Sequence, residues 1–288
     1  MTIRIGAAGS DGLGYMKAIT KAARMGLGCV EVAFTYGVRM KPEEAEAVGL
    51  LARNKGIALS VHAPYYINLA ADDPAKLAAS KERILSSCRM AAVMGARNVV
   101  FHAGFYQDRS AAKTFTRIAK QIDRLQAIMQ KHNWAVVLCP ETTGKPSQFG
   151  SLGECLLLAR ETGCGFTVDF AHLLARSGGN LDYGEVLDRL PRDVHAHFSG
   201  IEYGPKGERK HLKTTPKFFL PLAEALARRS VDVTLINESP QPYRDAAMMN
   251  RVIRKLLDAT SGWLEVVSQP RIMAAGKAQA DSKAEQPG

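Results

Sequence analysis

The sequence predicts a single-domain α/β protein with the (β/α)8 architecture of a TIM barrel. Short apolar segments alternate with longer amphipathic ones eight times along the 288 residues, and this alternation is typical of a parallel sheet covered by helices. Eight repeats in roughly 260 residues match the usual length of a closed barrel. An open, doubly wound sheet is the alternative, but no expected strand is followed by a glycine-rich phosphate-binding motif.

Residues that favour helix starts and ends bound the repeats. Asp73 and Pro74 suit the first positions of a helix, Ser151 and Glu154 form a capping box, and Gly95 suits a helix end. The expected strands cover residues 3–6, 29–33, 57–61, 98–101, 135–139, 165–169, 194–198 and 231–236. The expected helices cover residues 17–25, 43–55, 74–94, 110–130, 182–190, 216–229 and 245–258, and one further helix begins at Ser151.

The composition changes near the carboxyl end of the sequence. From about Ser268 onward the residues are mostly Ala, Gly, Lys, Gln and Ser without periodicity, a pattern typical of disorder. We therefore expect the barrel to span residues 1–262 and residues 263–288 to form a disordered tail.

The charge and the cysteine content of the chain indicate what kind of partner it binds and where in the cell it is expected. Lys and Arg number 38 against 28 Asp and Glu, a formal net charge of +10, which favours a polyanionic partner. The five cysteines are widely spaced and form no C-x-x-C motif, so neither disulfides nor a cysteine zinc site is expected. With no apolar run of about 20 residues and no signal-peptide pattern, we expect no membrane association and a cytoplasmic location, nucleoid-associated in a prokaryote.

Six of the expected strands carry a side chain that can bind metal within two residues of their carboxyl ends. These are His62, His102, Glu141, Asp169, His197 and Glu238, and His172 follows closely after Asp169. The carboxyl ends of barrel strands meet at the active-site mouth, where so many acids and imidazoles would be costly to bury without a cation. The sequence therefore predicts a multi-metal site.

His195 shares a strand face with His197 but lies deeper, so we expect it in a supporting or core position.

Eight short motifs at these strand ends and loops resemble the endonuclease IV family of abasic-site DNA repair enzymes, from residue 3 to about residue 260. They are F-T-Y-G-V-R, H-A-P-Y-Y-I-N-L, F-H-A-G, P-E-T-T-G, V-D-F-A-H, H-F-S-G, G-E-R-K-H-L and N-E-S-P. The resemblance implies a trinuclear zinc barrel that cleaves DNA on the 5′ side of abasic sites and leaves a 3′-hydroxyl. It implies metal-assisted phosphodiester hydrolysis, and no Ser-His-Asp or Cys-His set points to a side-chain nucleophile.

The same resemblance implies the distribution of ligands among up to three Zn²⁺ ions, with Mn²⁺ as a substitute. One ion would be held by His62, His102 and Glu141, a second by Glu141, Asp169, His197 and Glu238, and the third by His172 and a loop. The family usually supplies Asp-x-His from that loop, whereas this chain reads Glu208-Arg209-Lys210-His211. Lys210 falls where the imidazole belongs, so Glu208 and His211 are the hypothesised ligands. Otherwise the basic loop only touches phosphate, and the third metal is weak or absent.

Four further residues are expected to contact double-stranded DNA that carries abasic sites. Arg39, Tyr65 and Tyr66 match family positions that penetrate the helix at the lesion, where aromatic side chains offset lost base stacking. Lys145 is placed to contact a phosphate. A monomer is expected, because DNA must reach an open barrel mouth.

Two other functions remain open from the sequence. Sugar isomerases and epimerases with this barrel resemble the chain in Glu141, Asp169, His197 and Glu238, which suffice for one divalent ion. That alternative leaves several features without a shared function: His62, His102, the paired tyrosines, Arg39 and the net charge. The altered Glu208–His211 stretch also allows a protein that recognises lesions without cutting.

Overall fold

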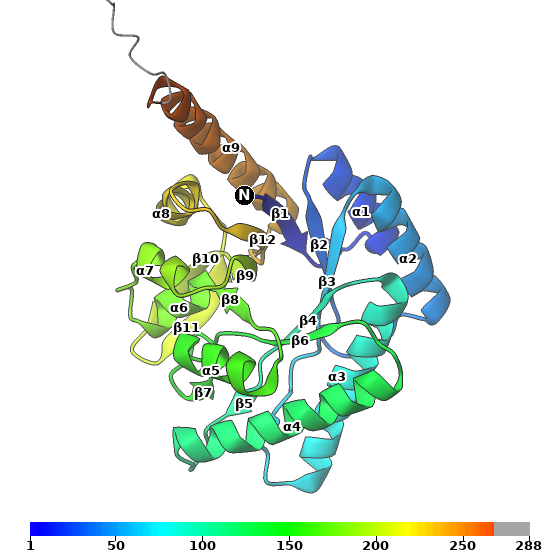
Figure 1. Cartoon of the computed structure of the whole chain (residues 1–288). Helices are drawn as coiled ribbons and strands as arrows, with labels where there is room; N and C mark the ends of the chain where they lie inside the picture. Colours follow the sequence, from blue (N-terminus) through cyan, green and yellow to red (C-terminus); the bar gives the residue numbers. More distant parts are fainter. Residues whose placement is uncertain (268–288) are drawn as a thin grey trace, which may run out of the picture.

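The computed structural model describes residues 1–267, and eight parallel strands within them form a nearly closed barrel with helices between the strands (Figure 1). The strands lie side by side in the order β6-β4-β3-β2-β1-β12-β9-β8. Their bounds are β1 (Ile3–Ala8), β2 (Cys29–Ala33), β3 (Ala58–His62), β4 (Asn98–Phe101), β6 (Val137–Pro140), β8 (Thr167–Asp169), β9 (Asp193–Phe198) and β12 (Asp232–Asn237). The predicted (β/α)8 fold is confirmed.

The helices lie outside the barrel, and several of them start or end at residues that the sequence indicated. They are α1 (Tyr15–Arg24), α2 (Pro42–Lys55), α3 (Pro74–Met94), α4 (Ala111–Lys131), α5 (Leu152–Thr162), α6 (Phe170–Arg176), α7 (Tyr183–Asp188), α8 (Pro216–Ala227) and α9 (Pro242–Val267). Asp73 accepts hydrogen bonds from the first turn of α3, and Ser151 and Glu154 form the capping box of α5.

The barrel closes between β6 and β8 through a single parallel bridge that pairs Glu141 with Thr167. The Thr142 amide donates to the Thr167 carbonyl at 3.0 Å. Gly165 precedes β8, and a Cβ atom there would lie 2.8 Å from Val137 Cγ1 and 2.9 Å from Cys139 Sγ. A side chain at residue 165 would therefore push β8 away from β6. Closure fixes Glu141 and Asp169 against each other at the barrel mouth.

Four features were missing from the expected element order. The two-residue strands β5 (Gly104–Phe105) and β7 (Gln148–Phe149) pair with each other and are too short to show a period. The strands β10 (Gly200–Gly204) and β11 (Gly207–Leu212) form a hairpin where a basic loop was expected. Helix α6 begins immediately after β8 without a loop. Helix α9 extends to Val267, five residues past the expected barrel boundary, and residues 268–288 of the expected tail lie outside the described residues.

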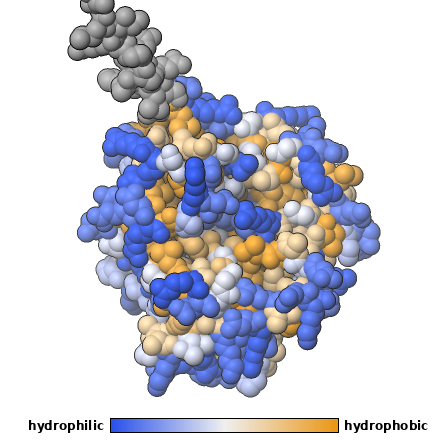
Figure 2. Space-filling view, viewed as in Figure 1, coloured by the Kyte–Doolittle hydropathy of each residue, from blue (hydrophilic) through white to orange (hydrophobic). Residues whose placement is uncertain are grey.

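Apolar side chains fill the space between the barrel strands and the helices, in two large clusters of buried residues. Figure 2 shows hydrophilic side chains around the margin of one face and more apolar ones toward its middle. None of the described helices combines the length and apolar composition that a membrane crossing requires. The five cysteines are all buried and free.

Candidate metal centre

The six predicted strand-end side chains meet at the carboxyl ends of six barrel strands. His62 is the last residue of β3, His102 follows β4, Glu141 follows β6, Asp169 ends β8, His197 lies near the end of β9, and Glu238 follows β12. His172 joins them from α6, and Glu208 and His211 join them from β11. We call these nine residues the mouth cluster. Six of them border a cavity of about 420 Å³: His62, His102, His172, Glu208, His211 and Glu238.

Glu141 is the centre of the mouth cluster. Its Oε2 lies 3.2 Å from His62 Nε2 and 3.0 Å from His102 Nε2. Its Oε1 lies 3.1 Å from His197 Nδ1 and 3.4 Å from His172 Nδ1. Only 1% of this side chain is exposed. One carboxylate therefore faces four imidazoles, two on each oxygen, and joins the two halves of the cluster.

Asp169 combines a structural role with an unused oxygen. Its Oδ1 accepts the His172 amide at 2.8 Å and so caps α6, while its buried Oδ2 has no hydrogen-bond donor. Burial, and to a smaller extent the nearby carboxylates of Glu141 and Glu238, raise the pKa of Asp169 although His172 opposes this. A buried carboxylate oxygen without a donor beside other acids is a position where a cation would compensate the charge.

Backbone carbonyls orient three of the imidazoles. The Nδ1 atoms of His62, His172 and His211 lie 2.8 Å, 3.0 Å and 3.1 Å from the carbonyl oxygens of Ala63, Thr142 and Glu238. A carbonyl can only accept, so these pairings place the ring proton on Nδ1 and leave the Nε2 lone pair directed into the mouth cluster. Histidine ligands of metal sites are held in this way.

A bulge in the β10–β11 hairpin explains how the altered loop still reaches the cluster. Residues three apart on a regular strand point to opposite faces. Here Glu202 pairs with Lys210 while Tyr203 pairs with Glu208, so Arg209 is an extra residue in β11. Glu208 and His211 then lie 3.5 Å and 3.2 Å from His172 Nε2. Lys210 lies 3.1 Å from Glu202 and is 65% exposed.

The donor set fits divalent metal ions. Within the mouth cluster, three groups of ligand atoms lie close enough to share a cation: His62 with His102 and Glu141; Glu141 with Asp169, His197 and Glu238; and Asp169 with His172 and His211. Imidazole nitrogens with carboxylate oxygens are donors that suit Zn²⁺ and related transition metals. Together with the unused Asp169 oxygen, this chemistry fits a divalent cation at the mouth cluster.

Without a cation, the histidines of the mouth cluster tend to hold protons and the neighbouring carboxylates stay ionised. Burial alone would lower the pKa of His62, but the Glu141 carboxylate outweighs this effect and raises that pKa to about 9. The same opposition raises the pKa values of His172 and His197 well above their usual value. Burial would raise the pKa of Glu238, but the His197 imidazole lowers it to about 2. Protonated histidines thus balance the acids when no metal does.

We expect the metal-free protein to lose stability as pH rises from 6.5 to 9. The pKa of His62 is about 9 in the fold and 6.5 as its ordinary value, so its stabilisation is complete below pH 6.5 and disappears as pH passes 9. Metal ions need the neutral imidazoles, so the stabilisation that zinc adds should grow over the same range. Urea unfolding of chelated and zinc-loaded protein at three pH values measures both trends. A metal-free protein equally stable across this range would contradict the expectation.

Substitution of His211 should remove one metal equivalent, whereas substitution of its neighbour Lys210 should not. His211 points into the mouth cluster, but Lys210 pairs with Glu202 on the outer side of the hairpin. We expect His211→Asn to bind one zinc fewer and Lys210→Gln to match the unmodified protein in metal analysis. Equal metal content in both variants would exclude His211 as a ligand.

The four predicted DNA-contact residues lie on the surface, and only one of them borders the mouth cavity. Tyr65 does so with 54% exposure, and its ring centroid lies 6.3 Å from that of His62. Tyr66 is 76% exposed and has a left-handed backbone with φ of 60°. Arg39 and Lys145 are exposed, and Lys145 lies beside the turn of the β10–β11 hairpin. Their contacts with DNA stay predictions.

Sequence reasoning missed three polar residues that support the cluster. Thr142 accepts the Asp169 amide on its Oγ1 at 2.8 Å and orients His172 through its carbonyl. Glu31 and Ser60 lie in the barrel interior, where Ser60 donates to Glu31 at 2.8 Å and His195 lies 3.0 Å from the same carboxylate. A glutamate in the middle of the apolar strand C-V-E-V-A was the signal that could have identified Glu31. His195 takes the supporting position expected for it.

The relatives that match the chain by sequence include an uncharacterised archaeal protein and probable endonucleases. An uncharacterised protein of Methanocaldococcus jannaschii, MJ0133, is 36% identical over 254 residues, which cover 83% of this chain and 92% of that protein. A probable endonuclease 4 of Mycobacterium leprae is 30% identical over 135 residues, 45% of this chain and 50% of the relative. The chain therefore matches only about half the length of that endonuclease.

Solved structures of proteins with different activities share the fold to a similar extent. Endonuclease IV from Thermus thermophilus aligns with a TM-score of 0.67 and 21% identity over 89% of this chain and 99% of that one. A D-tagatose 3-epimerase-like protein aligns with a TM-score of 0.69 and 18% identity over 92% of this chain and 100% of that one. At these identities the likeness concerns the fold and does not separate the two activities.

The chain matches one known protein family over most of the described barrel. The model of the xylose isomerase-like TIM barrel matches residues 19–259, from α1 to α9. The proteins that are similar to this chain include a probable endonuclease 4, an endonuclease IV and an epimerase-like protein. The chain belongs to the xylose isomerase-like TIM barrel family.

Proposed function

We propose that this protein is a metal-dependent hydrolase that cleaves DNA on the 5′ side of abasic sites and leaves a 3′-hydroxyl. The observation that carries the proposal is the pairing of His62 and His102 with Glu141 beside the four-residue group of Glu141, Asp169, His197 and Glu238. A site for one ion has no need of the two additional histidines. The sequence similarity to a probable endonuclease 4 supports the same activity.

The residues of the mouth cluster would hold zinc, or manganese in its place, in three positions. Bound divalent ions would supply Lewis acidity toward a phosphodiester and neutralise charge on its oxygens. Glu141 would fix the spacing of two positions because each of its oxygens faces a different pair of imidazoles. His172, Glu208 and His211 would hold the third position, with Thr142 and α6 setting the orientation of His172.

Residues around the mouth would recognise the damaged duplex. Tyr65 and Tyr66, both exposed, would fill the gap left by the missing base. Arg39 and Lys145 would contact phosphates, in agreement with the net charge of +10. The open mouth suits a monomer acting on duplex DNA.

A single-metal sugar isomerase or epimerase is the second candidate. The group of Glu141, Asp169, His197 and Glu238 suffices for one ion, and epimerases are among the similar structures. His62 separates the two proposals because it lies outside that group. His62→Asn should reduce DNA cleavage strongly, whereas a one-ion epimerase would keep its ion.

The test is incubation of zinc-loaded protein with a duplex that carries one abasic analogue resistant to elimination. We expect a single cut 5′ to the analogue, a product that a DNA polymerase extends, and no cut after chelation. An intact duplex of the same sequence is the control. Absence of cleavage with zinc or manganese restored would overturn the proposal, and retained binding without cleavage would favour lesion recognition alone.

A further inference from the structure

Glu31 lies in the middle of β2, inside the barrel and below the mouth cluster. Its side chain is fully buried and borders neither the mouth cavity nor the cavity at the opposite end of the barrel. Its Oε1 and Oε2 nevertheless lie 3.1 Å and 3.3 Å from Nε2 of His197. A buried carboxylate that substrate cannot reach is therefore in direct contact with a member of the mouth cluster.

His197 differs from the other oriented imidazoles of the cluster. His62, His172 and His211 present Nε2 to the cluster because carbonyls take their Nδ1 protons. His197 presents Nδ1, which lies 3.1 Å from Glu141 and 3.4 Å from Glu238. A neutral imidazole has one N–H donor and one lone pair, so donation from Nε2 to Glu31 leaves the Nδ1 lone pair for the cluster.

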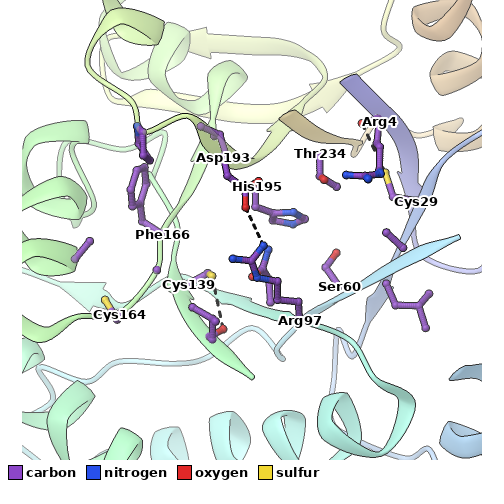
Figure 3. A pocket seen from close by; sticks show the side chains of 18 residues that line it. Arg4, Cys29, Ser60, Arg97, Cys139, Cys164, Phe166, Asp193, His195 and Thr234 are labelled. Atoms are coloured by element: carbon purple, nitrogen blue, oxygen red, sulfur yellow. Dashed lines mark hydrogen bonds and ion pairs between the residues drawn. The ribbon is translucent and has the colours of Figure 1, made fainter. Parts of the chain in front are cut away.

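Two further donors hold the Glu31 carboxylate in place. Ser60 Oγ donates to Oε2 at 2.8 Å, and His195 Nε2 lies 3.0 Å from the same oxygen. His195 and Ser60 also border a cavity of about 530 Å³ at the amino-terminal end of the barrel, where Arg97 pairs with Asp193 (Figure 3). Three strands, β2, β3 and β9, therefore contribute to one hydrogen-bonded group beneath the cluster.

A fourth metal ion explains the short distances around Glu31 less simply than hydrogen bonds do. The ligand atoms of Glu31, His195 and His197 do lie close enough to share a cation. An ion there would bind Nε2 of His197 while the mouth cluster uses Nδ1, which requires a fully deprotonated ring. Hydrogen bonds from Ser60, His195 and His197 to Glu31 Oε2 account for these contacts with ordinary neutral imidazoles. The buried Oε1 accepts no hydrogen bond and lies 3.1 Å from the same His197 nitrogen.

We propose that Glu31 is a positioning residue that fixes His197 with its Nδ1 lone pair directed at the candidate metal centre. The carboxylate–histidine–metal arrangement restricts both the ring orientation and the tautomer, and loss of such a partner weakens metal affinity about 10–100-fold. This inference rests on the metal content of the proposed function but not on the DNA substrate.

The test uses Glu31→Gln and Ser60→Ala in the full chain. The Glu31→Gln variant keeps the size of the side chain but loses a charge, whereas Ser60→Ala removes a support and leaves the carboxylate in contact with His197. Zinc affinity is measured by competition with a chromophoric chelator, and histidine tautomers by ¹⁵N–¹H spectra, with the His197 signals assigned from His197→Asn. We expect one zinc equivalent to bind about 10–100-fold more weakly in Glu31→Gln, an unchanged total capacity, and a shift of His197 away from the Nε2-protonated form.

Smaller changes are expected in Ser60→Ala, and Glu31→Asp provides the conservative variant if Glu31→Gln does not fold. Unchanged affinity together with an unchanged His197 tautomer would overturn the proposal. Loss of one whole equivalent at saturating zinc would also overturn it, because Glu31 would then be a ligand. A protein that binds zinc with this Glu31 dependence but never cuts DNA would refute the proposed function and leave the role of Glu31 standing. No zinc binding by the unmodified protein would refute both.

Discussion

Glu141→Gln is expected to reduce cleavage at abasic sites by at least about 10³-fold, which corresponds to roughly 4 kcal/mol of transition-state stabilisation. Glu141 belongs to two of the three donor groups and faces four imidazoles. An amide keeps the shape of the side chain, but its nitrogen cannot act as a second anionic donor, so the variant would lose the carboxylate that the two donor groups share. Cleavage rates at saturating zinc and the bound zinc per chain measure the effect together.

Glu185→Gln is the matched control because Glu185 is exposed in the first turn of α7. It makes the same chemical change away from the mouth cluster and should leave cleavage and metal content unchanged. A Glu141→Gln protein that still cuts at a rate within about tenfold of the unmodified protein would show that the reaction does not depend on the bridging carboxylate.

The barrel and the positions of its strand ends could be predicted because both follow from local patterns. Parallel strands in a barrel deliver their carboxyl ends to one mouth, so a residue such as His102 or Glu238 was located once its strand was identified. Helix starts such as Ser151 followed from capping chemistry alone. The short strands β5 and β7 were missed because two residues carry no periodic signal.

Parts of the candidate site depend on tertiary geometry that no local pattern records. The bulge at Arg209 decides which face of β11 carries Glu208 and His211, and it exists only in the pairing with β10. The contact between Glu31 and His197 joins residues 166 positions apart in the sequence. Asp169 shows a third limit, because no sequence pattern reveals that one of its oxygens caps α6 while the other stays free of hydrogen bonds.

Removal of metal is expected to lower the stability of the fold as well as to stop catalysis. A ligand at about 1,000 times its dissociation constant stabilises the native state by about 4 kcal/mol. For a chain of this size, 1 kcal/mol changes the unfolding temperature by about 2–4 °C, so chelation should lower it by roughly 10 °C. The physical reason is the mouth cluster itself, in which Glu141, Asp169 and Glu238 lie together and depend on protonated histidines once cations are absent.

Thermal unfolding of chelated protein with zinc, manganese or magnesium added back separates specific binding from a general salt effect. Zinc and manganese should restore the higher unfolding temperature, whereas magnesium should not, because the imidazole nitrogens of His62, His102 and His197 are poor ligands for it. Glu141→Gln should show a smaller difference between chelated and zinc-loaded states, since two ion positions share that carboxylate. Identical unfolding temperatures with and without chelator would mean that hydrogen bonds and protons alone hold the cluster together, and the metal-dependent hydrolase would lose its physical basis.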